Sequence, residues 1–174
     1  MDFRSVSRVN HSYIVIDNFL DNPDKVRESI LYSGIEQFVK IGNFPGVRTF
    51  PVDKNYQEMV LSKLNKMLPF EIKDADGSDC YAFGLSLESD IKTTGIHKDL
   101  SDWTGVLYLT PNAPIESGTI LFNEDNSLTD TIGNVYNRLI FFRGGLIQHR
   151  SNMSFGDSLE TGRLTQHFFF NEVK

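Results

Sequence analysis

The feature that most constrains the fold is a change in the sequence pattern at Cys80. From there on, short apolar runs recur and are separated by Gly, Asn, Asp and Pro. Runs of this length with turn-forming residues between them predict the strands of a β-sandwich or barrel. The candidate strands cover residues 80–87, 104–110, 118–122, 132–136, 139–143, 147–151 and 163–170. A double-sheet jelly roll of about eight strands fits this spacing.

The part of the chain before Cys80 predicts helices instead. Asn22 followed by Pro23 is typical of a helix N-terminus and predicts a helix over residues 23–37. Asp53 predicts the cap of a second helix, in which apolar residues keep helical spacing until Pro69 ends it. We therefore expect a mainly β fold with N-terminal helices, built as a double-stranded β-helix, which is a cupin-like jelly roll.

The length of 174 residues predicts a single domain. We expect this domain to span residues 1–174, with 1–79 as N-terminal helical support and 80–174 as the jelly-roll core. No internal repeat or linker divides the chain.

Composition narrows the partners and the compartment. The net charge of -6, with Lys and Arg scattered along the chain, disfavours binding to nucleic acid. Cys80 is the single cysteine, which suits a reducing compartment. No apolar stretch reaches the roughly 18 residues that a membrane span needs. We expect a cytoplasmic protein without membrane contact, and the sequence does not predict its oligomeric state.

Three residues form a candidate metal site. His97 and Asp99 are two residues apart, so on an extended segment their side chains point the same way. His149, 52 residues further along, could join them from another strand. Two imidazoles and one carboxylate on one face of a metal are typical of non-haem Fe(II) oxygenases, which leave other coordination positions open. The alternative for each residue is structural: a loop histidine beside a carboxylate, and a half-buried strand histidine.

The last predicted strand carries a candidate anion site. Alternation along it places Arg163, Thr165 and His167 on one face, and mainly apolar residues on the other. A buried arginine beside a threonine needs a partner, and a carboxylate ligand would satisfy both. In the alternative, this face is turned to solvent. His167 could be a third metal ligand or a co-substrate contact, but we favour a core histidine held by a hydrogen bond.

With these residues in order, the chain resembles the Fe(II)/2-oxoglutarate-dependent dioxygenase superfamily, in its prolyl-hydroxylase-like branch. The resemblance rests on the order His-x-Asp, His, Arg-x-Thr, with Arg163 placed 14 residues after His149. It also rests on four segments that look like family elements: residues 17–20, 105–110, 118–122 and 138–142.

The resemblance implies that His97, Asp99 and His149 bind Fe(II), and that Arg163 and Thr165 hold the far carboxylate of 2-oxoglutarate. It further implies that O₂ converts this co-substrate to succinate and CO₂ while a C–H bond of the substrate is hydroxylated.

One departure from the family concerns a tyrosine that often helps to hold 2-oxoglutarate. Our alignment gives Leu107 that position and turns Tyr108 the other way, so Tyr81 is the candidate replacement. Trp103, Arg48 and Asn123 are weak candidates for substrate contacts. The substrate is left open between an amino acid, a peptide and another small molecule. Two other functions are kept: a cupin-like metal-binding protein without 2-oxoglutarate chemistry, and a non-catalytic binding module on the same fold.

Overall fold

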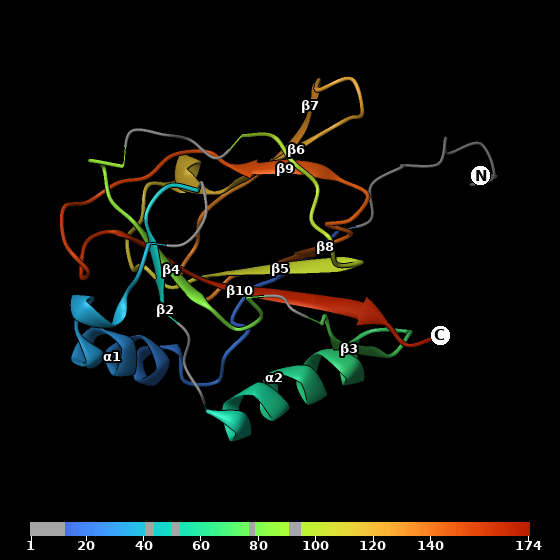
Figure 1. Ribbon diagram of the computed structural model, residues 1–174, viewed down its shortest axis with the longest axis horizontal. Helices are drawn as coiled ribbons and strands as arrows, with labels where there is room; N and C mark the ends of the chain where they lie inside the picture. The colour runs from blue at the N-terminus through green and yellow to red at the C-terminus, as the bar shows by residue number, and fades with distance from the viewer. Residues whose placement is uncertain (1–12, 41–43, 50–52, 77–78, 91–94) are drawn as a thin grey trace.

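The computed structural model describes residues 13–40, 44–49, 53–76, 79–90 and 95–174. These residues form a mainly β fold with two α-helices and two antiparallel sheets, as expected (Figure 1). None of the described helices is long and apolar enough to cross a membrane.

Both helices begin where their capping residues predict. Helix α1 (Pro23–Ser33) starts with the Asn22 side chain accepting a hydrogen bond from the Lys25 amide. It is shorter than expected, because Gly34 adopts a φ of 81° and a 3-10 helix (Ile35–Gln37) follows. Helix α2 (Lys54–Met67) is capped by Asp53 and ends at Leu68, immediately before Pro69.

The large sheet has seven strands, most of them where apolar runs were found. In spatial order it contains β1 (Tyr13–Ile16), β8 (Leu139–Phe142), β5 (Trp103–Tyr108), β10 (Arg163–Glu172), β4 (Phe83–Ser86) and β2 (Val47–Thr49), while β3 (Ile72–Asp74) pairs with the far end of β10. Strands β2 and β3 were not expected. They have three residues each, which is too short for an alternation pattern to be visible in the sequence.

The small sheet has three strands, ordered β7 (Leu128–Ile132), β6 (Thr119–Phe122) and β9 (Gln148–Ser151). The strand expected over residues 132–136 is wrong, because β7 ends at Ile132. The chain then forms a loop that Asn137 holds with a φ of 61° and side-chain hydrogen bonds to both backbone groups of Leu20.

The large sheet separates two apolar clusters. On its outer face, α1 and α2 pack through Ile30, Val60 and Leu64 against a cluster that includes Leu164 and Phe168 of β10. On its inner face, Val106, Tyr108, Ile140 and Phe142 pack with Leu121 and Ile132 of the small sheet. Figure 1 shows this arrangement, with the helices beneath the large sheet and β6 and β9 above it. The space between the sheets is where the site lies.

Strand β10 follows the predicted alternation. Arg163, Thr165, His167 and Phe169 line the cavity between the sheets. Leu164, Phe168 and Phe170 belong to the outer cluster. Gln166 also lies on the outer side, where it accepts a hydrogen bond from the Tyr56 hydroxyl of α2 at 2.5 Å.

Candidate metal centre

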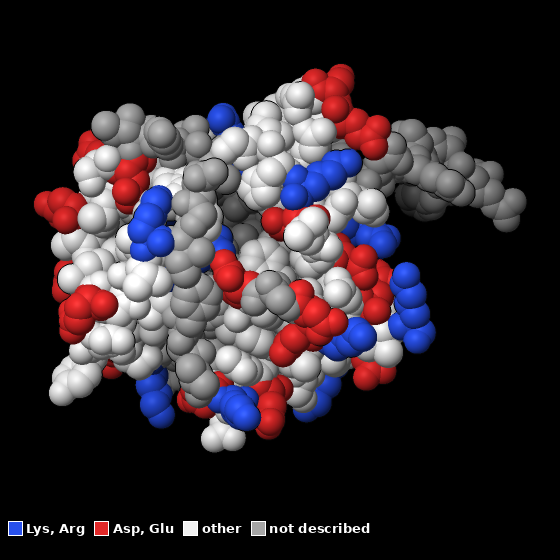
Figure 2. Space-filling view, viewed as in Figure 1, with Lys and Arg blue, Asp and Glu red and all other residues white. Residues whose placement is uncertain are grey.

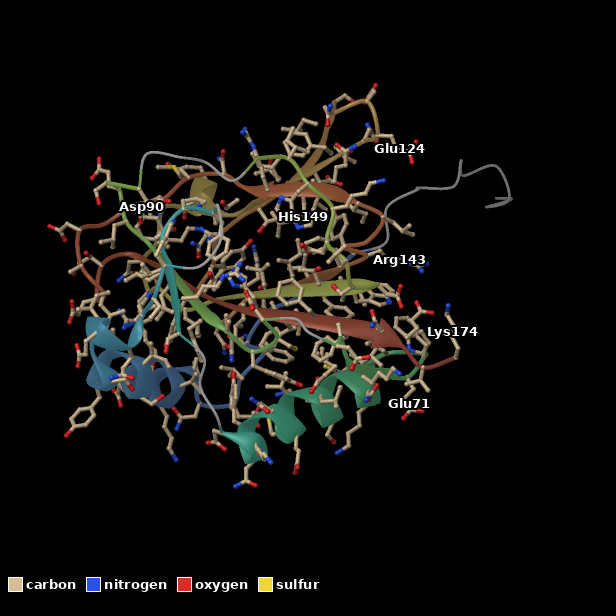
Figure 3. The ribbon with its side chains drawn as sticks, viewed as in Figure 1. Glu71, Asp90, Glu124, Arg143, His149 and Lys174 are labelled. Carbon is tan, nitrogen blue, oxygen red and sulfur yellow. The ribbon has the colours of Figure 1, made fainter. Side chains whose placement is uncertain are left out.

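His97, Asp99 and His149 meet at one end of the cavity. Their possible ligand atoms all lie within 4.8 Å of one another. The Nε2 atom of His149 is 3.2 Å from Oδ2 of Asp99, and that of His97 is 3.6 Å from Oδ1. A metal about 2.0–2.2 Å from nitrogen and oxygen ligands sets neighbouring ligands at about this separation. Figure 3 shows His149 on the side of β9 that faces the large sheet.

The backbone holds the two histidines together. His97 and His149 form an isolated antiparallel bridge, in which each amide donates to the other residue's carbonyl, at 3.1 and 2.9 Å. Each ring also has a local partner: Nδ1 of His97 is 2.8 Å from the Gly95 carbonyl, and Nδ1 of His149 is 2.9 Å from the Ile147 carbonyl. A carbonyl can only accept, so each Nδ1 carries a proton and each neutral ring presents a bare Nε2. That is the nitrogen a metal needs.

Asp99 is fixed from the other side. Thr104 of β5 donates a short hydrogen bond to Oδ2, and the Asp99 amide donates to the Gly144 carbonyl at 2.9 Å. Gly144 has no room for a side chain, because a Cβ there would lie 2.0 Å from Oγ1 of Thr104 and 2.8 Å from Oδ2 of Asp99. The carboxylate is therefore positioned before any ligand is bound.

The electrostatics of the cluster favour a cation. Burial raises the pKa of Asp99, but hydrogen bonds from the rings of His149 and His97, when these carry a proton on Nε2 as well, and from Thr104 outweigh it and hold the pKa well below its usual range. The hydrogen bond to Asp99 raises the pKa of His97. Bare imidazole nitrogens facing a carboxylate repel it unless a proton or a metal ion lies between them. The residues therefore fit a divalent metal.

Arg163 lies in the same cavity, which has a volume of about 410 Å³. Its side chain is buried, with 5% of the residue exposed. Nε donates to the Ser117 carbonyl at 2.8 Å and one terminal nitrogen to the Gly118 carbonyl at 3.4 Å. Among the residues that the structure describes, no carboxylate pairs with it. A guanidinium has five N–H donors, so the group retains capacity for an anionic ligand.

The tyrosine beside Arg163 is Tyr108, which corrects the alignment that gave Leu107 this position. Tyr108 lies opposite Thr165 in the β5–β10 pairing, so both side chains point to the inner face. The Tyr108 ring is 5.7 Å from the guanidinium carbon of Arg163, and its hydroxyl is 2.7 Å from Oγ1 of Thr119. Leu107 belongs to the outer cluster.

Tyr81 is therefore not needed as a replacement, and it lies on the wrong side of the large sheet. Its hydroxyl donates to Asp74 at 2.7 Å, and its ring meets Phe168 and Phe170 edge to face. These contacts bury it in the outer cluster, away from Arg163.

Two of the three weak substrate candidates also lie away from the cavity. Trp103 is stacked between Phe70 and Phe141 in the outer cluster and donates to Glu172. Asn123 sits at the turn that joins β6 and β7, where its amide bonds to Ser127. Arg48 is the third candidate, and it lines the cavity.

His167 is buried, as expected for a core histidine, but only one of its two ring nitrogens has a hydrogen-bond partner among the described residues. Its Nε2 is 3.3 Å from Oγ1 of Thr165, but its Nδ1 is buried without a partner among the described residues. The sequence signal for it was the alternation of β10, which places it two residues beyond Thr165 on the cavity side.

No family model matches the chain, and no curated protein matches it. Solved structures do match. A prolyl hydroxylase from Trichoplax adhaerens, solved with a hypoxia inducible factor peptide fragment, is 15% identical with a TM-score of 0.62, over 92% of this chain and 83% of that one. A prolyl-4-hydroxylase from Pseudomonas putida is 15% identical with a TM-score of 0.62, over 91% and 92%. The chain has the fold of the Fe(II)/2-oxoglutarate oxygenases. SnoN, a non-heme α-ketoglutarate-dependent epimerase from nogalamycin biosynthesis, shares this oxygenase fold at 12% identity and a TM-score of 0.60, over 92% and 78%.

The surface agrees with the distribution of charge in the sequence. On the face drawn in Figure 2, Lys and Arg side chains are interspersed with Asp and Glu rather than gathered into one basic patch.

Proposed function

We propose that this protein is an Fe(II)- and 2-oxoglutarate-dependent dioxygenase that hydroxylates a C–H bond. His97, Asp99 and His149 would bind the iron, while Arg163 and Thr165, joined by Tyr108, would hold 2-oxoglutarate. The two sheets would be the two halves of a double-stranded β-helix within one domain. The oxygenase fold and the convergence of the three ligand side chains support this proposal.

The observation that carries the proposal is Arg163. A buried guanidinium with only carbonyl partners is costly, because its charge is not compensated. An anionic ligand in the cavity would compensate this charge. A dicarboxylate can place one carboxylate on Arg163 and extend the other end toward the metal ligands, which a simple metal-binding protein has no need to do.

The protein's own residues supply position and a dry environment. When bound, iron and O₂ supply the oxidation of 2-oxoglutarate to succinate and CO₂ that hydroxylation of the substrate requires. Arg163 and Thr165 would fix one end of the co-substrate by directed hydrogen bonds. Ile140 and Phe142 would exclude water from the closed side of the cavity.

The substrate would be an amino acid, a peptide or another small molecule. A peptide is supported by the Trichoplax adhaerens neighbour, which was solved with a peptide fragment bound. Access is from the side of His97, the more exposed of the two histidines, with 41% of its side chain accessible.

The test is an anaerobic titration of Fe(II)-loaded protein with 2-oxoglutarate, followed by the visible charge-transfer band of the chelate. Wild type should form the band, and Arg163→Ala should need at least tenfold more 2-oxoglutarate while binding metal normally. Arg27→Met is the control, since Arg27 lies on α1 and bonds the Glu160 carbonyl outside the cavity.

The other outcomes point to other functions. Bound metal without the band would support a cupin-like metal-binding protein. Absence of metal binding would support a non-catalytic binding module.

A further inference from the structure

Two cavity residues of the large sheet carry buried nitrogen atoms without a partner. Nε of Arg48 and Nδ1 of His167 are both closed off from solvent, and neither has a hydrogen-bond partner among the described residues. Gly84 separates them: it lies opposite Arg48 on one side and Thr165 on the other, and a Cβ on it would lie 2.8 Å from Cε1 of His167. The missing side chain lets the His167 ring pack directly over the Gly84 backbone, so no side chain of Gly84 lies between the ring and Arg48.

A third arginine that lines the cavity, Arg150, belongs to the small sheet and not to this wall. Arg150 also has a buried Nε without a partner. It lies on β9 opposite Ile120 of β6, and its guanidinium is 5.7 Å from the Phe122 ring. Side chains alternate along a strand, so Arg150 points away from the side to which His149 points.

The guanidinium of Arg48 is fixed and electrically balanced. Its carbon lies 3.8 Å from the centre of the Phe44 ring, which covers one face. One terminal nitrogen donates to Oδ2 of Asp79 at 2.6 Å. Unlike Arg163, Arg48 therefore already has a counter-ion, and the donors that Asp79 leaves free suit an uncharged acceptor such as a carbonyl oxygen.

His167 is neutral and offers an acceptor. Burial, then the positive charges of Arg48 and Arg163, lowers the pKa of His167 well below its usual range. Thr165 can donate its single hydroxyl proton either to the Gly84 carbonyl, 3.4 Å away, or to a bound carboxylate, while in both cases accepting from Nε2 of His167 at 3.3 Å. Either arrangement satisfies Nε2 and leaves Nδ1 as a bare acceptor. Nδ1 would then repel a carboxylate and attract an N–H group.

The charges of the loaded site also favour a neutral group. The divalent metal and Arg163 carry three positive charges, which Asp99 and the two carboxylates of 2-oxoglutarate balance. Arg48 and Asp79 balance each other. A substrate carboxylate at this wall would bring a charge that neither the balanced Arg48–Asp79 pair nor a neutral His167 compensates.

We propose that Arg48 and His167 form the substrate subsite, and that it takes an amide group: the carbonyl oxygen accepts from Arg48, and the N–H donates to Nδ1 of His167. This inference rests on the proposed function for the identity of the bound molecule as the oxidised substrate. The amide can be a primary carboxamide or a peptide bond that carries a hydrogen. The amide nitrogen of a prolyl peptide bond has no hydrogen, so that bond does not fit.

The test is saturation-transfer NMR with four small probes of similar size: acetamide, N-methylacetamide, N,N-dimethylacetamide and acetate. Acetamide or N-methylacetamide should bind at least about fivefold more tightly than the other two, as expected for one additional hydrogen bond. Preference for acetamide indicates a primary carboxamide, and preference for N-methylacetamide indicates a peptide-type amide.

Variants assign the binding to this wall. Arg48→Met and His167→Phe should each remove the preference, and Arg48→Lys tests the arginine if the methionine variant fails to fold. Arg27→Met should bind as wild type does. Tightest binding of acetate, equal binding of all four probes, or an unchanged preference in both wall variants would overturn the proposal.

The two proposals can fail separately. Saturation transfer needs neither metal nor 2-oxoglutarate, so the probes are tested on the protein alone and again with Zn(II) and 2-oxoglutarate. Amide binding without a charge-transfer band would leave the subsite and reject the dioxygenase. A charge-transfer band without a preference for amides would support the dioxygenase and reject the amide subsite.

Discussion

Replacing Thr104 by valine should weaken metal binding while leaving the shape of the site almost unchanged. Valine has the size of threonine but lacks the hydroxyl that donates to Oδ2 of Asp99. Thr104 is 2% exposed and packs against the position of Gly144, so water cannot easily replace the lost donor. Asp99 would then be freer to rotate and would hold its negative charge with one fewer partner.

The magnitude follows from the kind of hydrogen bond. A hydrogen bond to a charged group contributes about 1.5–3 kcal/mol. Loss of a group that orients a metal ligand costs about 10- to 100-fold in metal affinity. At about 1.4 kcal/mol per tenfold, this corresponds to about 1.4–2.8 kcal/mol, so the two estimates agree. The Asp99 side chain is 14% exposed, and solvent screening reduces the effect only slightly.

The assay is competition for Zn(II) against a chelator of known affinity, at fixed pH. Thr104→Ser is the matched control because it keeps the hydroxyl and loses only a methyl group. Thr104→Val should lose at least tenfold in affinity and Thr104→Ser much less. Equal affinities for wild type and Thr104→Val would show that this hydrogen bond does not position the ligand.

Three further predictions follow from other contacts. Replacing Tyr108 by Phe should weaken 2-oxoglutarate binding about three- to tenfold without changing metal affinity, as measured by the charge-transfer titration; an unchanged titration would remove Tyr108 from the site. Gly144→Ala should push Thr104 off Asp99, lowering metal affinity at least about tenfold and the free energy of unfolding by about 1–3 kcal/mol; chelator competition and denaturant unfolding would measure both, and wild-type values would refute the clash. Burial raises the pKa of Cys80 to about 12, so the native state keeps its proton when the unfolded thiol loses it; the free energy of unfolding should be unaffected below about pH 8.5 and fall above it by up to about 1.4 kcal/mol per pH unit, and Cys80→Ser should lack this slope.

Strand β10 shows what could be predicted from the sequence. Its ten residues are long enough for alternation to be visible, and its polar positions, Arg163, Thr165 and His167, all recur at a spacing of two. When alternate side chains of a strand are polar and the others are apolar, only one orientation of the strand buries the apolar side chains in the core. The pairing of His97 and Asp99 as candidate metal ligands was also predicted from local spacing, and the two side chains do lie in one cluster with His149.

Strand β5 shows why other residues were misplaced. The sequence alignment turned Leu107 to the inner face and left Trp103 in the loop before the expected strand, as a weak substrate candidate. The assignment of Leu107 is wrong by one residue, since Thr104 and Val106 line the cavity and Tyr108 lies on the same inner face. Trp103 begins β5 and packs in the outer cluster. Both faces of β5 are buried, so hydrophobicity could not distinguish them. Only the pairing with β10 does, and that pairing joins residues far apart in the chain.

Arg48 illustrates a limit of a different kind. Strand β2 has three residues, and its path to the cavity depends on pairing with β4. Its counter-ion, Asp79, lies 31 residues away in the chain. Nothing in the local sequence distinguishes a buried arginine with a counter-ion from a surface arginine. That Arg48 has a carboxylate partner and Arg163 has only carbonyl partners is therefore visible only in the structure.

The backbone bridge between His97 and His149 has a consequence for how the protein acquires its metal. The main chain joins these residues and their Nδ1 protons have carbonyl partners without any ion present. The entropy of closing a long loop is therefore lost during folding and not during metal capture. The apoprotein should fold first and load metal afterwards, unlike a zinc finger, whose chain folds around its ion. Slow hydrogen exchange at the His97 and His149 amides in metal-free protein would reveal this order, and rapid exchange at both would contradict it.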